Sequence, residues 1–246
     1  MYLSYRSIVP VLTVVATRTF AMSVASVPPS MQLTESLQTN LPRVHDSDLV
    51  ALDFTPVGVR EGAGSSKFRR VAVDHSKARG SIAFVARRPG WVLCREHGQQ
   101  LSELAARNGH DFGFWGIVKE TGVDDEGLSD FYNKYYNFPL YRDVELVSYA
   151  AFGNKKITEN MTWNPFKLYR GYKELTKRLK DKKDLEGNLV GEGMIKGGVF
   201  VLNPDGEVVY AYEENTGDPI VLEDIQAAMD SMRAEEGTQQ EVSQEL

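Results

Sequence analysis

The stretch SIAFVARRPGWVLCREHGQQLSELAARNG, residues 81–109, decides the fold that this sequence predicts. Its first part, Ser81–Ala86, is a nearly continuous apolar run of strand length, typical of a strand buried on both faces of a sheet. Pro89–Gly90 ends that run. From Cys94 onward the apolar residues recur at helical spacing, and Asn108–Gly109 provides a helix stop. The stretch therefore predicts a strand followed by a helix, with the only cysteine of the chain where the helix begins.

The rest of the chain adds further elements around this strand and helix. We predict a second buried strand at 111–120, an acidic-started helix at 124–137, a brief extended segment at 138–143, a hairpin at 197–214 and a helix at 220–232. In the hairpin, Asn203-Pro-Asp-Gly206 supplies the turn. Upstream, 50–59 is predicted as a short strand or hairpin and 58–70 as a loop. The order describes a mixed α/β sheet with a βαβ half and a ββα half.

Composition excludes several classes of protein. A chain of 246 residues with 42% apolar residues can bury a sizeable core. Its net charge of −6 argues against a nucleic-acid binder. One cysteine excludes an internal disulfide framework and a multi-cysteine metal site. The four histidines show no metal-ligand spacing, so no bound metal is expected.

The ends of the chain differ from its middle. Residues 1–30 contain two arginines, many serines and threonines and no carboxylate, which is the profile of an organelle transit peptide. A secretory reading of Ile8–Ala16 stays open, but Pro10 and Arg18 leave no run of about 20 apolar residues for a membrane span. We expect a targeting segment for a plastid or mitochondrion, with a cytoplasmic location as the alternative. We assign 31–233 to one domain and 234–246 to a disordered acidic tail.

The predicted domain carries an inserted helical segment at about 150–190. Within it, NPFKLYRGYKELTKRLKDKKD (164–184) interleaves basic residues with tyrosines and leucines. Such a helix can lie on anionic lipid. We expect instead that it packs its Tyr/Leu stripe against the domain, without membrane association.

Two segments carry a family resemblance. ARRPGWVLCREHGQQLSEL (86–104) and GEGMIKGGVFVLNPDGEVVYAYEENTGDPIVLEDIQAAM (191–229) resemble the peroxiredoxin-like 2 family, AhpC/TSA-type antioxidant proteins that include prostamide/prostaglandin F synthase. The likeness runs from about Gly80 to Met232, with a looser middle. It implies a thioredoxin-like fold, a mixed central sheet flanked by helices. It also implies a redox cysteine at the position of Cys94.

One departure from the family matters. The family commonly has C-x-x-C at this point, whereas this chain has Trp91-Val92-Leu93-Cys94, so no dithiol can form within one chain. What remains resembles the T-x-x-C arrangement of true peroxiredoxins, whose cysteine attacks peroxide. The resemblance therefore implies a thiol-dependent antioxidant oxidoreductase that reduces peroxides or lipid-derived peroxides through Cys94. The alternative is a redox-inactive thioredoxin-fold binding module that lost the dithiol.

The resemblance also implies the partners of this chemistry. Attack on peroxide turns the Cys94 thiolate into a sulfenic acid, which an external thiol such as glutathione or thioredoxin restores. No cofactor is bound, and NADPH enters only through the external reductase. Prostaglandin reduction is the less secure activity because it is associated with the dithiol form. The sequence leaves the oligomeric state open.

Reactivity at Cys94 needs nearby cations. A free thiol is mostly protonated near neutral pH, and a helix N-terminus changes its pKa by less than about one unit. Arg87 and Arg88 end the strand and point to opposite faces, so one of them can approach the thiol, and Arg88 is our first choice. His97 shares the helical face of Cys94. Simpler alternatives are arginines that pair with carboxylates and a histidine at the surface.

Each remaining candidate residue has a purely structural explanation beside the functional one. Cys94 lines up with Leu101 and Leu104, so it is also a candidate for a buried, inert core residue. Trp91 either covers the thiol as an apolar wall or fills the core. Gly197 and Gly198 either allow close backbone approach to the cysteine or act as turn residues.

Overall fold

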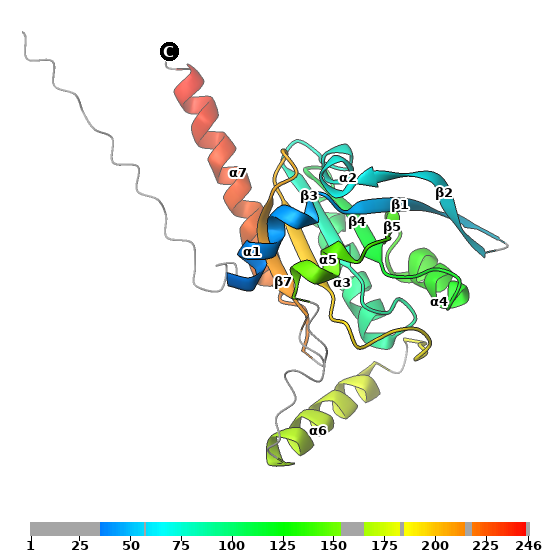
Figure 1. Cartoon of the computed structure of the whole chain (residues 1–246). Coiled ribbons are helices and arrows are strands. Elements are labelled where there is room, and N and C mark those ends of the chain that lie inside the picture. Colours follow the sequence, from blue (N-terminus) through cyan, green and yellow to red (C-terminus); the bar gives the residue numbers. More distant parts are fainter. Residues whose placement is uncertain (1–34, 57, 154–164, 183–184, 215–217, 245–246) are drawn as a thin grey trace, which may run out of the picture.

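The computed structural model describes residues 35–56, 58–153, 165–182, 185–214 and 218–244. Its strands form one mixed sheet in the order β2-β1-β5-β4-β3-β6-β7 (Figure 1). The strands are β1 Asp48–Thr55, β2 Gly58–Lys67, β3 Gly80–Val85, β4 Phe112–Val118, β5 Leu140–Asp143, β6 Gly198–Leu202 and β7 Val208–Glu213. The helices are α1 Glu35–Val44, α2 Phe68–Asp74, α3 Val92–Asn108, α4 Asp125–Asp130, the π-helix η2 Phe131–Tyr135, α5 Val147–Ala151, α6 Pro165–Asp181 and α7 Leu222–Gln244.

The centre of the sheet is the predicted βαβ–ββα unit. Strands β3 and β4 are parallel, with Gly80 opposite Phe112, and α3 connects them. Strand β6 then pairs antiparallel with β3 on the other side, β7 pairs antiparallel with β6, and α7 follows. This topology confirms the thioredoxin-like fold. Helix α6 is the predicted inserted helical segment.

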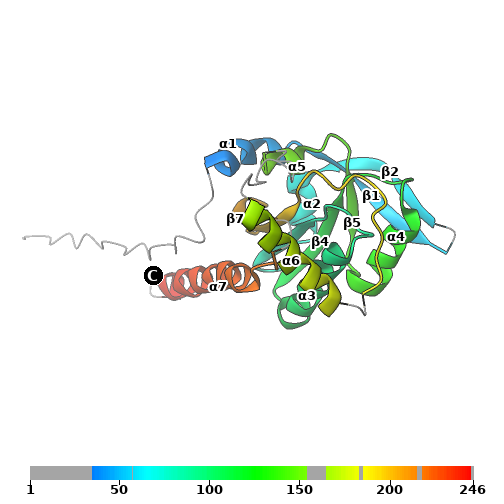
Figure 2. The same cartoon turned by 90° about the horizontal axis from the view of Figure 1, so that it is seen from below.

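The continuous apolar run of β3 is explained by burial on both faces. Alternate residues of a strand point to opposite sides of the sheet. Ile82 and Phe84 join the hydrophobic cluster formed with α3, α4 and α7, while Ala83 and Val85 join the cluster formed with α1, α2 and α5. Figures 1 and 2 show these two helix layers on either side of the sheet.

The turn between β6 and β7 follows the chemistry of its sequence. The Asn203 side-chain oxygen accepts hydrogen bonds from the backbone N–H groups of Asp205 (3.1 Å) and Glu207 (2.8 Å). Gly206 has a φ of 76°, a left-handed conformation that costs glycine little. The predicted hairpin is therefore confirmed together with its turn.

The short strand predicted within 50–59 is confirmed as β1, but the predicted loop at 58–70 is wrong. Strand β2 pairs with β1 from Thr55 opposite Gly58 to Asp48 opposite Lys67, and α2 begins directly afterwards. Strand β2 forms an edge of the sheet and is mostly exposed. Backbone pairing with β1 is enough to keep β2 in the sheet. Strand β2 therefore needs no alternation of apolar and polar residues, and its sequence shows none.

Two predictions about the ends of the chain have different outcomes. The predicted targeting segment, 1–30, lies outside the described residues. The predicted disordered tail from 234 is wrong as far as Gln244, because α7 continues to that residue. Glutamate, glutamine and alanine are good helix formers, and extending an existing helix avoids the cost of nucleation.

The prediction for the inserted helix is also wrong in one respect. The tyrosines expected to pack against the domain are exposed: 67% of Tyr169 and 68% of Tyr172 is accessible to solvent. Near the end of α6 a charged residue contacts the domain, because the Arg178 side chain binds the Glu96 carboxylate of α3. Figure 2 shows α6 next to α3.

Candidate functional site

Cys94 lies in the first turn of α3, directly after the end of β3. Helix α3 begins after Trp91, whose backbone is extended and whose side chain makes no capping hydrogen bond. A tight turn, in which the Trp91 N–H donates to the Arg88 carbonyl (3.0 Å), returns the chain toward the strand. The Arg88 N–H consequently donates to the Cys94 Sγ atom at 3.4 Å. The fold thus places the thiol where a backbone donor reaches it.

A buried ion pair lies beside the thiol. The Arg87 guanidinium is 3.4 Å from a carboxylate oxygen of Glu214, and both side chains are at most 5% exposed. The guanidinium also lies over the Trp91 ring, 4.0 Å from its centroid. Trp91, which occupies the place of the family's first cysteine, therefore stacks on the cation nearest the thiol. Neither of its two predicted roles described this contact.

Burial dominates the protonation of Cys94. Only 1% of the residue is exposed, and burial raises the pKa of its thiol to about 11. The Glu214 carboxylate raises this pKa as well, whereas Arg87 and the Arg88 N–H lower it. The thiol is therefore protonated at neutral pH in this conformation. The reactive thiolate implied by the family resemblance is therefore not the form of Cys94 in this conformation, although the Arg87 guanidinium lies close by.

That cation is Arg87, and the side chain of Arg88 lies elsewhere. The Arg88 guanidinium packs against Gly193, where an added Cβ would meet its Nη2 atom at 2.1 Å. Its buried Nε atom has no hydrogen-bond partner among the described residues. Arg88 contacts the cysteine through its backbone N–H alone and not through its side chain. Arg88 was our first choice for the cation near the thiol, whereas in the structure the guanidinium that acts on Cys94 is that of Arg87.

His97 is buried, so its expected surface alternative is wrong. Its Nε2 atom is 3.4 Å from the Arg178 guanidinium of α6, which in turn binds Glu96 at 2.7 Å. Lys182 adds a second contact to Glu96 at 3.2 Å. Burial lowers the pKa of His97, and Arg178 lowers it further, while Glu214 and Glu96 raise it. The imidazole is thus held neutral between the Arg87–Glu214 pair and α6.

The two candidate glycines allow close approach of neighbouring backbone carbonyl groups, and Cys94 is not among the atoms nearest to them. A Cβ on Gly197 would lie 2.0 Å from the Val85 carbonyl oxygen, and one on Gly198 would lie 2.1 Å from that of Tyr212. The Gly197 N–H also donates to Glu214 at 3.4 Å. The side chain of the neighbouring Lys196 is buried and pairs with Glu213 at 3.2 Å.

Sequence reasoning missed Glu214 and the contact of α6 with α3. Glu214 follows the end of β7 within a polar run, and nothing in that run distinguishes it from its neighbour Glu213. The one available signal was the need of a buried arginine for a carboxylate. The pairing of Glu96 with Arg178 joins residues 82 positions apart, which local patterns do not reveal.

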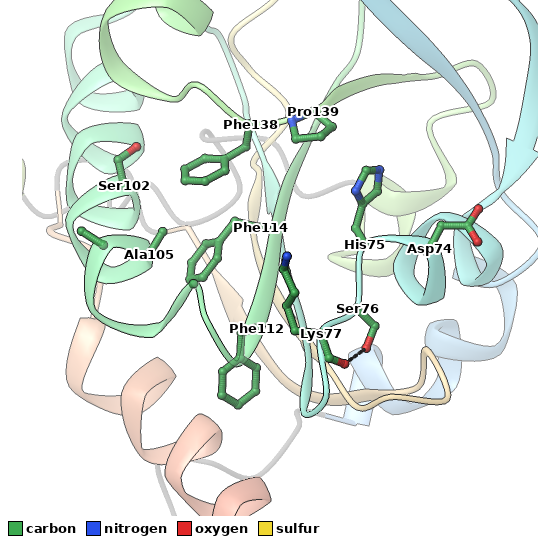
Figure 3. Close-up of a pocket in the computed structure, with 13 residues that line it drawn as sticks. Asp74, His75, Ser76, Lys77, Ser102, Ala105, Phe112, Phe114, Phe138 and Pro139 are labelled. Atoms are coloured by element: carbon green, nitrogen blue, oxygen red, sulfur yellow. Dashed lines mark hydrogen bonds between the residues drawn. The ribbon is translucent and has the colours of Figure 1, made fainter.

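The pocket in Figure 3 does not have Cys94 among its lining residues. Its volume is about 570 Å³, and its walls include Phe114 and Phe138 on one side and His75 and Lys77 on the other. Within the described residues there is no group of three or more His, Cys, Asp or Glu suited to a metal ion, and no helix long and apolar enough to cross a membrane.

Three histidines that are wholly or partly buried predict acid lability. Burial lowers the pKa of His45, His75 and His97 below 6.5, so at acidic pH the unfolded chain binds more protons than the folded one. Their contribution to stability is complete above about pH 6.5 and is lost as the pH falls toward the folded-state values. We expect the melting temperature to fall between about pH 7.5 and about pH 5.5.

The variant His97→Asn tests the share of one histidine, because asparagine cannot take up the proton. We expect it to show a smaller loss of melting temperature on acidification than the wild type. His110→Asn is the matched control, since the side chain of His110 is 72% exposed. An equal acid-induced loss in the wild type and His97→Asn would contradict the prediction.

Comparison with known proteins gives consistent results. The sequence profile described as AhpC/TSA antioxidant enzyme matches residues 99–216, a range that begins just after Cys94. Peroxiredoxin-like 2A of Xenopus tropicalis is 25% identical over 208 residues, covering 82% of this chain and 79% of the relative. The protein of the same name from Danio rerio is 30% identical over 156 residues, covering 59% of this chain and 66% of the relative.

Solved structures with a similar chain path include two peroxide-related proteins. The bacterioferritin comigratory protein of Xanthomonas campestris, studied for alkyl peroxide reduction, is 14% identical with a TM-score of 0.45, covering 79% of this chain and 94% of its own. A yeast mitochondrial 1-Cys peroxiredoxin, studied for thiol resolution through glutathione and thioredoxin systems, is 12% identical with a TM-score of 0.43. That match covers 71% of each chain.

Proposed function

We propose that this chain, whose residues 99–216 match the AhpC/TSA antioxidant enzyme profile and which is similar to peroxiredoxin-like 2A proteins, is a thiol-dependent peroxidase that works through Cys94. The observation that supports this best is the position of the Sγ atom. It lies in the first turn of α3, accepts the Arg88 N–H and has the Arg87 guanidinium as a neighbour. Both groups favour the thiolate, which is the form that attacks peroxide.

The proposed reaction consumes one peroxide and two reducing equivalents. The Cys94 thiolate attacks one oxygen of the O–O bond, so that an S–O bond forms as the O–O bond breaks. The leaving oxygen takes a proton from water and departs as an alcohol or as water. The sulfur, oxidised by two electrons, is then a sulfenic acid. An external thiol displaces water from it, and a second thiol releases Cys94 and leaves with the first as a disulfide.

Turnover also needs a conformation in which the thiol is accessible. In the described conformation burial and Glu214 keep Cys94 protonated. Opening of the first turn of α3 removes the burial, which is the largest cause of the raised pKa, and leaves Arg87 to stabilise the thiolate. In this proposal Trp91 positions the Arg87 guanidinium by stacking. Gly197 holds Glu214 in place through its backbone N–H.

The substrate and the location complete the proposal. A small peroxide or a lipid-derived peroxide is the substrate, and glutathione or thioredoxin is the reductant. The leader at residues 1–30 directs the protein to a plastid or mitochondrion. A second candidate, the redox-inactive binding module, draws support from one specific observation, the closed environment and raised pKa of Cys94.

Trapping of the sulfenic acid separates the two candidates. Folded protein is treated with hydrogen peroxide or cumene hydroperoxide in the presence of dimedone, and its intact mass is measured. Because the chain has one cysteine, a single dimedone adduct assigns the product to Cys94. We expect this adduct in the folded wild type. If only protein unfolded in denaturant forms it, the fold shields the thiol from peroxide and the binding module is the correct reading.

A further inference from the structure

The exposed face of α6 is strongly aromatic. In addition to Tyr169 and Tyr172, described above, Phe166 is 84% exposed. The three residues are spaced three apart in a helix, so they lie within an arc of about 120°. Large aromatic side chains clustered on one exposed helical face are unusual for a surface that meets only water.

The contacts of α6 with the domain explain why this face points outward. Arg178 and Lys182 bind Glu96, which is buried in the first turns of α3. Tyr169 precedes Arg178 by nine residues, which is two and a half helical turns. The two side chains consequently lie on opposite sides of α6. Anchoring the helix through Arg178 therefore directs Tyr169 away from the domain.

The same helix concentrates positive charge. Residues 165–182 contain seven lysines and arginines and two acidic residues, a net charge of +5, while the whole chain carries −6 and the remainder therefore −11. The basic side chains at 170, 173, 177 and 180 are exposed. The helix is thus a positive element on a negative protein, and an anionic surface attracts it while repelling the remainder.

We propose that α6 docks the protein onto a bilayer surface that contains anionic phospholipid. Phenylalanine and tyrosine rings enter the interface between headgroups and acyl chains, and the neighbouring lysines bind the lipid phosphates and carboxylates. The helix lies in the plane of the membrane and does not cross it, because it combines the aromatic residues with a high density of charge. The exposure of Tyr169 and Tyr172 is the observation that leads us to propose docking in place of the expectation of no membrane association.

Docking is independent of chemistry at Cys94. Docking through α6 places the first turns of α3, where Glu96 lies, next to the membrane. A protein with Cys94→Ser should bind vesicles like the wild type, so failure of the peroxidase proposal leaves this one testable.

Vesicle sedimentation tests the proposal with the full chain. Wild type is mixed with phosphatidylcholine vesicles and with vesicles that also contain phosphatidylserine, at low and high salt. We expect binding to the anionic vesicles that weakens as salt is raised, because ionic screening shortens the range of attraction. All variants carry the same first 34 residues, so any membrane binding by that segment is common to them.

Two pairs of variants locate the binding surface. Lys173→Gln with Lys177→Gln should weaken partitioning to anionic vesicles roughly 25-fold, since each lysine near such a surface contributes roughly fivefold. Tyr169→Ser with Tyr172→Ser should also weaken it. The matched controls, Lys77→Gln with Arg107→Gln and Val123→Ser with Leu189→Ser, change exposed residues elsewhere and should bind like the wild type.

Three results would overturn the proposal. One is equal binding to neutral and anionic vesicles. Another is equal binding by the α6 variants and the wild type. The third is failure of the wild type to bind vesicles together with self-association, measured by analytical ultracentrifugation, that the tyrosine variant abolishes. In that case a second copy of this chain covers the face.

Discussion

Replacement of Cys94 by serine is expected to reduce peroxide consumption to the background rate of the assay. The chain has no second thiol that could take over the reaction. Serine is close to cysteine in size and its oxygen can accept the Arg88 N–H, so the fold should survive. The serine hydroxyl is not ionised at neutral pH and cannot form a sulfenic acid. The measurement is NADPH oxidation coupled through glutathione reductase or thioredoxin reductase, with each reductant tried separately.

The comparison requires that Cys94→Ser is folded and that the peroxide consumption of the wild type comes from Cys94. Circular dichroism and a melting curve should show Cys94→Ser folded like the wild type. Ser102→Ala, a variant in the distant half of α3, controls for nonspecific effects of changing that helix. Wild-type turnover equal to that of Cys94→Ser would show that any peroxide loss does not depend on this sulfur.

The second large effect concerns the buried ion pair beside the thiol. Arg87→Leu leaves the Glu214 carboxylate buried without its 3.4 Å partner. Breaking such a pair typically costs about 3–5 kcal/mol of stability. We expect a loss of this size in the free energy of unfolding, measured by urea denaturation. The double variant Arg87→Leu with Glu214→Gln should recover part of the lost stability, because the glutamine leaves no unpaired carboxylate at position 214.

The two partners should move the pKa of Cys94 in opposite directions. Glu214 raises that pKa and Arg87 lowers it, so Glu214→Gln should make the thiol ionise at lower pH and Arg87→Leu at higher pH. The pH dependence of iodoacetamide alkylation measures the shift. Arg70→Leu is the control for stability, because Arg70 and Asp74 are exposed and such pairs contribute about 0–1 kcal/mol. Shifts in the same direction for both variants would contradict the arrangement.

The sequence predicted the central unit of the fold because that unit depends on local patterns. Strand β3 and helix α3 follow from the apolar run, the Pro-Gly interruption and the helical spacing after Cys94. The β6–β7 hairpin follows from its Asn-Pro-Asp-Gly turn. Strand β2 was missed because edge pairing requires no apolar residues. The end of α7 was missed because a polar composition can indicate either disorder or a solvated helix.

The candidate site was predicted less completely, and the reason is physical. Cys94 and its two neighbouring arginines could be predicted because they lie at the junction of a strand and a helix. That junction follows from the order of the elements along the chain. Burial, which sets the protonation of Cys94 and His97, depends on what packs over the helix from elsewhere in the chain. Glu214 and Arg178 come from distant segments, and only the folded structure brings them to the cysteine and to His97.

Trp91 in place of a second thiol has a consequence for damage and repair. On the proposed chemistry, the oxidised sulfur has no neighbour in its own chain with which to condense. It persists until an outside thiol arrives, and a second peroxide can meanwhile carry it to the sulfinic acid, which ordinary thiols do not reverse. The survival of the enzyme under oxidant load would then be set by the supply of its reductant.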